Sequence, residues 1–179
     1  GVIALDRAAG LWNGSIEGAT WSSEGVGNGA AGSASGALAF DGIDDRVQIG
    51  TPDVTGQALT LTAWIRADGF GIGDARILSK ATGVSEQDHY WMLSTVVQGG
   101  APLLRFRVKA GGSTSTLVSS GSALRVGEWT FVAAVYDGAR MRLYLDGAEV
   151  GSMAKSGALA TSPAVPAAMM LPARASPTS

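Results

Sequence analysis

The sequence contains no cysteine and a single histidine, His89. Without cysteine the chain forms no disulfide, offers no thiolate nucleophile and has no cysteine-based metal site. One histidine gives no basis for a Ser-His-Asp arrangement, and no Gly-x-Ser-x-Gly elbow occurs. These absences remove the commonest forms of nucleophilic catalysis from consideration.

Charged residues are also sparse, at 16%, with a net charge of −2 and no basic run. Nucleic-acid binding requires a basic surface, so no nucleic-acid partner is expected. No apolar run approaches the ~18 residues that span a membrane, so no membrane span is expected either. Apolar residues make up 46% of 179, enough for the core of one domain. The chain begins at Gly1 without Met or a signal pattern, as expected of a mature form or a fragment.

Alternation of apolar and polar residues dominates what is present. Between Glu128 and Gly151, three alternating runs are separated by Asp137-Gly138 and Asp146-Gly147. Asp-Gly between such runs predicts tight hairpins, because type I′ turns need positive φ at both central residues. No helical period is evident. The pattern predicts an all-β fold, an antiparallel two-sheet β-sandwich.

The remaining segments fit this interpretation. Asn13-Gly14-Ser15 predicts a turn, and the Gly/Ser/Ala-rich segment 22–36 predicts a loop. Short alternating or β-branched runs bounded by turn residues predict further strands. These runs are residues 38–40, 47–49, 59–65, 76–80, 90–97, 103–109 and 114–119.

Three segments in order resemble laminin-G-like domains of the concanavalin A-like lectin/glucanase superfamily, in its bacterial branch. They are Ala37–Val47, Leu59–Arg66 and Trp129–Val150. The resemblance extends from about Trp12 to Leu159 and implies a jelly roll. It is specific for the fold and poorly specific for function, because one fold hosts many functions.

Residues 161–179 depart from this pattern. Proline cannot donate to a sheet ladder, and the segment holds Pro163, Pro166, Pro172 and Pro177 among alanines and serines. We therefore predict a sandwich over 1–160 and a Pro/Ala/Ser-rich tail over 161–179. The resemblance implies further strands after Leu159, so the sandwich is predicted to lack its C-terminal strands. A frameshifted coding end and a natural linker both remain open as explanations of the tail.

Two polar clusters are candidates for Ca²⁺, which takes six to eight oxygen ligands. The first is Glu86, Gln87 and Asp88, in a loop that, by resemblance to pentraxins, supplies part of a calcium site. The second is Asp44 and Asp45 beside Asp41. A solvated turn is the alternative for the first cluster, and a turn built by Asp41-Gly42 is the alternative for the second.

The candidate ligand surface is a polar sheet face, provided that this face is concave; a merely solvated sheet face is the alternative. Tyr144 alternates with Leu143 and Leu145 and so points away from the core. We group with it the other residues suited to a sugar or a protein partner, namely Tyr90, Arg105, Arg107 and Arg142. Trp64 and Trp129 lie in motifs that the resemblance places in the core, so we expect both to be buried.

The resulting prediction is a non-catalytic, extracellular or cell-surface binding module for carbohydrate, calcium-assisted and part of a larger protein. A structural adhesion spacer that binds protein is one alternative. A glycoside hydrolase or polysaccharide lyase is the other, because Glu86-x-Asp88 resembles the Glu-x-Asp-x-x-Glu motif of the glucanase branch. Trp91 occupies the place of the second Glu. The two-carboxylate chemistry of such enzymes is therefore not expected here.

Overall fold

The computed structural model describes residues 3–5, 12–26, 36–71, 75–121 and 124–169. Within them the chain is all-β, with one short 3-10 helix. The elements are β1 (Ile3–Ala4), β2 (Gly14–Glu17), β3 (Thr20–Ser22), β4 (Ala37–Ala39), β5 (Arg46–Gln48), β6 (Leu59–Ile65), β7 (Ala75–Ala81), η1 (Glu86–Asp88), β8 (His89–Gln98), β9 (Ala101–Ala110), β10 (Ser113–Val118), β11 (Thr130–Tyr136), β12 (Arg140–Leu145), β13 (Ala148–Ala154) and β14 (Ala167–Met169).

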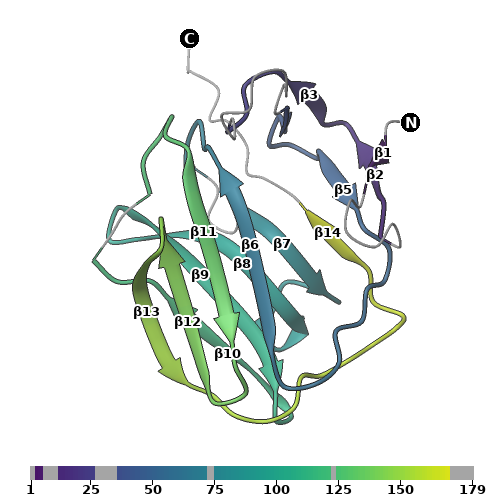
Figure 1. Cartoon of the computed structure of the whole chain (residues 1–179), viewed down its shortest axis with the longest axis vertical. Coiled ribbons are helices and arrows are strands. Elements are labelled where there is room, and N and C mark those ends of the chain that lie inside the picture. Colours follow the sequence, from purple (N-terminus) through teal and green to yellow (C-terminus); the bar gives the residue numbers. More distant parts are fainter. Residues whose placement is uncertain (1–2, 6–11, 27–35, 72–74, 122–123, 170–179) are drawn as a thin grey trace.

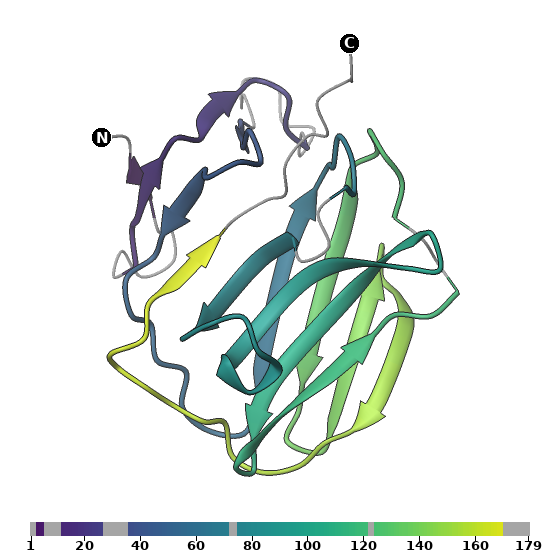
Figure 2. The ribbon, with the colours of Figure 1, turned by 180° about the vertical axis from the view of Figure 1, so that it is seen from behind.

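Two antiparallel sheets face each other as a jelly-roll sandwich, as the sequence predicts (Figure 1). The large sheet has the order β1-β2-β5-β14-β7-β8-β9-β10, and the small sheet has the order β13-β12-β11-β6. A separate two-stranded hairpin, β3-β4, lies beside one end of the sandwich. In Figure 2 the large sheet is turned toward the viewer.

The register of the large sheet separates its two faces. One row across it is apolar on every strand from β2 to β10, namely Ile16, Val47, Met169, Leu78, Leu93, Phe106 and Leu117. The last four of these residues pack in the core between the two sheets, whereas the first three form a second cluster with Leu38 and Phe40. The next row is largely polar and faces outward, namely Ser15, Gln48, Ala168, Ser79, Met92, Arg107 and Thr116. Side-chain alternation along each strand produces this division. Most of the core therefore lies between the two sheets.

The two Asp-Gly hairpins both form, but with different turns. Asp146 and Gly147 have φ of 47° and 84°, as the predicted type I′ turn requires. At the first hairpin only Gly138 has positive φ, 90°. There Oδ1 of Asp137 accepts hydrogen bonds from the Ala139 and Arg140 amides at 2.9 and 2.7 Å. The aspartate side chain, and not a type I′ backbone, closes that turn.

The predicted end of the sandwich at residue 160 is wrong. Strand β14 lies inside the large sheet, between β5 and β7. The amide of Ala167 donates to the Gly50 carbonyl at 2.8 Å, and the Ile49 amide donates to the Ala167 carbonyl at 2.9 Å. Pro163 and Pro166 precede these three residues, so no proline interrupts the ladder. At least one strand predicted to be missing is therefore present, while residues 170–179 of the tail lie outside the described residues.

Two smaller predictions concern the N-terminal part of the chain, and one of them is wrong. Gly14 and Ser15 belong to β2 and not to a turn, because they pair with β1 and β5. The predicted loop over 22–36 lies outside the described residues from 27 to 35.

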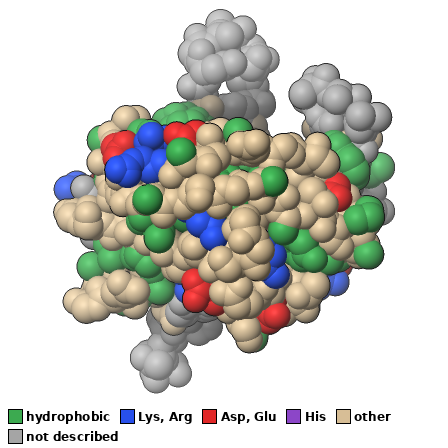
Figure 3. Space-filling model, turned by 90° about the horizontal axis from the view of Figure 1, so that it is seen from below, with side chains coloured by type: hydrophobic (Ala, Val, Ile, Leu, Met, Phe, Trp, Pro, Cys, Tyr) green, Lys and Arg blue, Asp and Glu red, His purple; other side chains and the backbone are tan. Residues whose placement is uncertain are grey.

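No described helix is long and apolar enough to cross a membrane. On the face seen in Figure 3, basic and acidic side chains are scattered among neutral and apolar ones.

Candidate binding site: an aromatic groove

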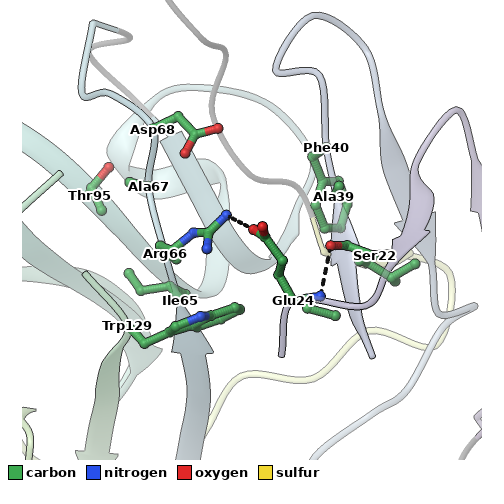
Figure 4. A pocket seen from close by; sticks show the side chains of 12 residues that line it. Ser22, Glu24, Ala39, Phe40, Ile65, Arg66, Ala67, Asp68, Thr95 and Trp129 are labelled. Carbon is green, nitrogen blue, oxygen red and sulfur yellow. Dashed lines mark hydrogen bonds and ion pairs between the residues drawn. The ribbon is translucent and has the colours of Figure 1, made fainter. Parts of the chain in front are cut away.

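A groove lies between the β3-β4 hairpin and the end of β6, where the sandwich opens (Figure 4). It consists of two adjoining hollows of about 100 and 340 Å³ that share several lining residues. Its most prominent side chains are Trp21, Trp64, Trp129, Phe40, Glu24 and Arg66. We call this surface the aromatic groove.

Strand alternation exposes Trp64. In β6 the residues Leu59, Leu61 and Ile65 are buried, whereas Trp64 has 50% of its surface exposed. Its ring lies 5.4 Å from that of Phe131, its partner on β11, at a tilt of 55°. The expectation that Trp64 is a core residue is therefore wrong. Its exposure could have been predicted from its position, because Trp64 shares the outward face of the strand with Thr60 and Thr62.

Two other tryptophans come from different segments. Trp21 of β3 is 55% exposed, and Trp129, just before β11, is half-buried. Large apolar side chains exposed together on one surface mark interaction sites more often than isolated ones do. The prediction of a buried Trp129 holds only in part, since its ring also lines both hollows.

An ion pair lies in the wall of the groove. Arg66 forms an ion pair with Glu24, 42 residues earlier in the chain. The Arg66 guanidinium also lies over the Trp129 ring, 5.6 Å from its centroid. In Figure 4 Arg66 extends across the hollow to Glu24, and Asp68 lies on the same wall. The groove thus combines aromatic faces with a few fixed polar groups, as small-molecule sites usually do.

The predicted ligand residues do not share one surface. Arg142 and Tyr144 lie on the outer face of the small sheet, and Arg142 pairs with Asp137 at 2.5 Å. Arg105 and Arg107 lie on the outer face of the large sheet, on the opposite side of the sandwich. The grouping of these residues on one polar sheet face is therefore wrong.

Tyr90 is the fifth residue of the predicted ligand set, and it is partly buried. It packs against the main core. The ammonium groups of Lys109 and Lys80 lie 5.1 and 5.9 Å from its ring centroid. Such cation–π contacts hold the ring in place. Its proposed role in ligand binding stays a prediction.

The predicted calcium loop is tied to the neighbouring strand β10. The Gln87 side chain bonds both backbone groups of Thr114, accepting at 2.9 Å and donating at 3.1 Å. Oε1 of Glu86 accepts from the Thr116 hydroxyl at 2.6 Å, and Oδ2 of Asp88 accepts from the Ser85 amide at 2.9 Å. These bonds use the three side chains to hold η1 in place. Calcium binding by this loop stays a prediction.

The second acidic cluster is more compact. Ligand oxygens of Asp41, Asp44 and Asp45 lie within 4.8 Å of one another. Asp45 is buried, and its Oδ2 accepts from the Asp41 amide at 2.7 Å. A Cβ at Gly18 would lie 1.8 Å from Oδ1 of Asp45, so the glycine makes room for the carboxylate. The cluster could supply three of the six to eight oxygens that Ca²⁺ takes. Calcium binding by these aspartates stays a prediction.

Comparisons with known proteins place this geometry in context. The chain is 29% identical to mouse pappalysin-1 over 127 residues, which cover 66% of this chain and 8% of that protein. It therefore spans a small part of this relative. The family model for the concanavalin A-like lectin/glucanases superfamily matches residues 41–171.

Solved structures share the fold. Domain 4 of an extracellular arabinanase from Geobacillus stearothermophilus, solved in complex with arabinotriose, aligns with a TM-score of 0.64 at 14% identity. The alignment covers 96% of this chain and 79% of that one. A native heptameric pentraxin from Limulus polyphemus aligns with a TM-score of 0.50 at 21% identity, covering 69% and 55%. The bacterial branch suggested by the sequence stays a prediction, but the chain itself belongs to the concanavalin A-like lectin/glucanase superfamily.

Proposed function

We propose that this chain is a non-catalytic module that binds a carbohydrate in the aromatic groove, as part of a longer extracellular protein. The observation that carries the proposal is the convergence of Trp21, Trp64 and Trp129 around one ion pair. Two of these rings are at least half exposed. Leaving that much aromatic surface in water is costly, and a ligand with an apolar face would cover it.

The chemistry of the groove suits a sugar. Pyranose and furanose rings present C–H surfaces that pack on the electron-rich faces of aromatic rings. Their hydroxyl groups need directed partners, which Glu24, Arg66 and Asp68 supply from the same walls. The groove has few ionic groups beyond these, which favours a neutral sugar chain. The fold shared with an arabinanase domain solved with arabinotriose is compatible with this proposal.

Calcium assistance remains part of the proposal. Asp41 follows Phe40, one of the residues that line the groove, so a cation held by Asp41, Asp44 and Asp45 would lie near it. Such a cation would fix the β4-β5 turn and hence the position of Phe40. Its role would be to order the groove. Binding to Glu86, Gln87 and Asp88 is less well supported because those side chains already bond to protein groups.

One observation favours a hydrolase as the second candidate. Glu24 and Asp68 line the same hollow, and two carboxylates are what most glycosidases use. The Glu24 carboxylate, however, is already engaged in the ion pair with Arg66. Release of reducing ends from a bound polysaccharide, lost on Glu24→Gln, would replace the binding proposal with this one.

The test is a titration followed by tryptophan fluorescence, because three of the five tryptophans line the groove. Arabino-oligosaccharides are tried first, then a broad panel of neutral and acidic glycans, each with Ca²⁺ and with chelator. Saturable quenching or enhancement by a glycan supports the proposal. No response to any glycan, together with saturable binding of an extracellular matrix protein, would favour the adhesion alternative.

A further inference from the structure

The outer face of the large sheet carries a cluster of basic side chains away from the aromatic groove. Arg105 and Arg107 are two residues apart on β9 and project from the same face. Arg76 on β7 lies opposite Ser94 on β8, which in turn lies opposite Arg105. Arg76 and Arg107 are half-buried, and Arg105 is buried. This face is turned toward the viewer in Figure 2.

Neutral groups anchor two of these guanidinium groups. Nε of Arg107 donates to the Thr116 hydroxyl at 3.2 Å, and Nη2 of Arg76 donates to the Gly83 carbonyl at 3.2 Å. Nη1 of Arg107 also lies 3.3 Å from Nδ1 of His89. Each guanidinium has five N–H donors, so donors remain on both side chains. The anchoring bonds hold the two groups in place and reduce the entropy lost when a ligand binds.

No ion pair with a described residue neutralises Arg76 or Arg107. Two carboxylates lie near these arginines. Glu86 reaches Arg107 through the Thr116 hydroxyl, from which it accepts at 2.6 Å. The Asp88 carboxylate lies against Gly83, whose carbonyl accepts from Arg76. The arginines also act on one another. Burial, and after it the charge of Arg107, lower the pKa of Arg76 and lower the pKa of Arg105 to about 10. Arg76 and Arg107 are thus close enough for their positive charges to interact.

We propose that Arg76 and Arg107 form a second binding site, which takes one oxyanion group, a carboxylate or a sulfate, on the outer face of the large sheet. The planar forks of two guanidinium groups match the paired oxygens of either group. An anion bound there offsets the repulsion among the arginines. It also accepts hydrogen bonds from those guanidinium N–H groups that have no other acceptor. For a glycan-binding domain, an acidic sugar is the ligand that would carry such a carboxylate or sulfate. That identification rests on the proposed function, whereas the anion site does not.

The test follows the arginine Nε–H signals by NMR at constant ionic strength, with inorganic sulfate, glucuronate and glucose as probes and chloride as the balancing anion. We expect saturable shifts of the Arg76 and Arg107 signals with sulfate and glucuronate, and none with glucose. Tighter binding of glucuronate than of sulfate identifies a sugar acid as the ligand. Equal binding shows that the site recognises the anion alone.

Variants test whether Arg76 and Arg107 form the site. Arg107→Gln and Arg76→Gln should each weaken sulfate binding at least about tenfold, since a hydrogen bond to a charged group is lost. Arg107→Lys keeps the charge without the fork and should give an intermediate loss. Arg140→Gln, on the exposed side of the small sheet, is the matched control and should bind as wild type does.

The proposal is overturned if sulfate produces no saturable shift in the folded wild type, or if Arg140→Gln weakens binding as much as Arg107→Gln. Unchanged binding in Arg107→Lys and Arg76→Gln together would also overturn it. Should Arg107→Gln fail to fold, Arg107→Lys and the wild-type shifts still decide the matter. Loss of neutral-glycan binding in Trp64→Ala without loss of sulfate binding would separate this site from the aromatic groove.

Discussion

The ammonium group of Lys80 lies 3.0 Å from Oδ1 of Asp53, with 1% of the lysine side chain and 24% of the aspartate side chain exposed. The same ammonium donates to the Pro52 carbonyl at 2.7 Å, and the Ser162 amide donates to the same Asp53 oxygen at 2.9 Å. One ion pair therefore joins β7, the segment before β6 and the segment that leads into β14.

We expect Asp53→Asn to destabilise the fold by about 3 kcal/mol or more, because it leaves the buried Lys80 charge unpaired. Lys80→Met should cost less, since Asp53 retains contact with water. Combining the two changes should recover part of the loss, as replacing both members of a buried pair often does. Urea unfolding of the four proteins measures these differences. Equal stability of Asp53→Asn and wild type would show that the pair is not held as described.

His89 should make stability depend on pH near neutrality. Burial lowers its pKa, the hydrogen bond to the Ser85 carbonyl raises it, and the charges of Arg107 and Arg76 lower it, with a net lowering. Its Nε2 is buried and has no hydrogen-bond partner among the described residues, so protonation there would bury an unpaired N–H. The unfolded chain therefore takes up the proton more readily than the folded one.

The free energy of unfolding should fall as the pH drops below about 6.5, the ordinary histidine value, and level off below the folded pKa of His89. Because His89 is the sole histidine, the slope between pH 7 and 5.5 is largely its own. Chemical unfolding across this range gives the slope, and His89→Gln should flatten it. A stability that rises on acidification through this window would reverse the assigned direction.

Strand β14 provides a test of the corrected C-terminal boundary. Ala167 is fully buried and lies opposite Lys80. Ala167→Lys would place a second cation beside that buried ammonium, and should cost at least about 3 kcal/mol or prevent folding. The matched change Ala164→Lys is at an exposed position and should stay within about 0.5 kcal/mol of wild type. Similar stabilities of the two variants in thermal melts would place β14 outside the sheet.

Most strands could be predicted because each carries its own evidence. In β9, Leu104, Phe106 and Val108 alternate with Arg105 and Arg107, so the core face is visible without knowledge of the partners. Strand β14 has no such pattern. It is three residues of Ala and Met, and its position depends on hydrogen bonds to Gly50 and Ile49, more than a hundred residues away in the sequence. Local propensity carries no record of these bonds.

The aromatic groove was harder to predict for the same reason. The outward position of Trp64 followed from alternation, but the resemblance suggested a core role and that interpretation was wrong. Glu24 could not be linked to Arg66 from the sequence, because 42 residues separate them and Glu24 belongs to no motif. The predicted ligand residues failed as a set because alternation gives a side chain's face but not the sheet that carries it.

The Glu24–Arg66 pair should position the groove more than it stabilises the fold. Both side chains are partly exposed, so the pair contributes little to stability. Glu24→Gln should therefore leave the melting temperature nearly unchanged, yet weaken glycan binding by about three- to tenfold, because Arg66 loses its fixed orientation over Trp129. Calorimetric titration and a thermal melt on the same sample separate the two effects. A large loss of stability without a change in affinity would assign the pair a structural role.

The most direct test of the central claim compares Trp64→Ala with Trp12→Ala by isothermal titration against the glycan that binds wild type best. Both tryptophans are similarly exposed, 50% and 43%, but Trp12 is not among the residues that line the groove. If the aromatic groove holds the glycan, Trp64→Ala loses at least about tenfold in affinity while Trp12→Ala binds as wild type does. Equal affinity of the two variants, both folded, would show that the glycan binds elsewhere and would contradict the account.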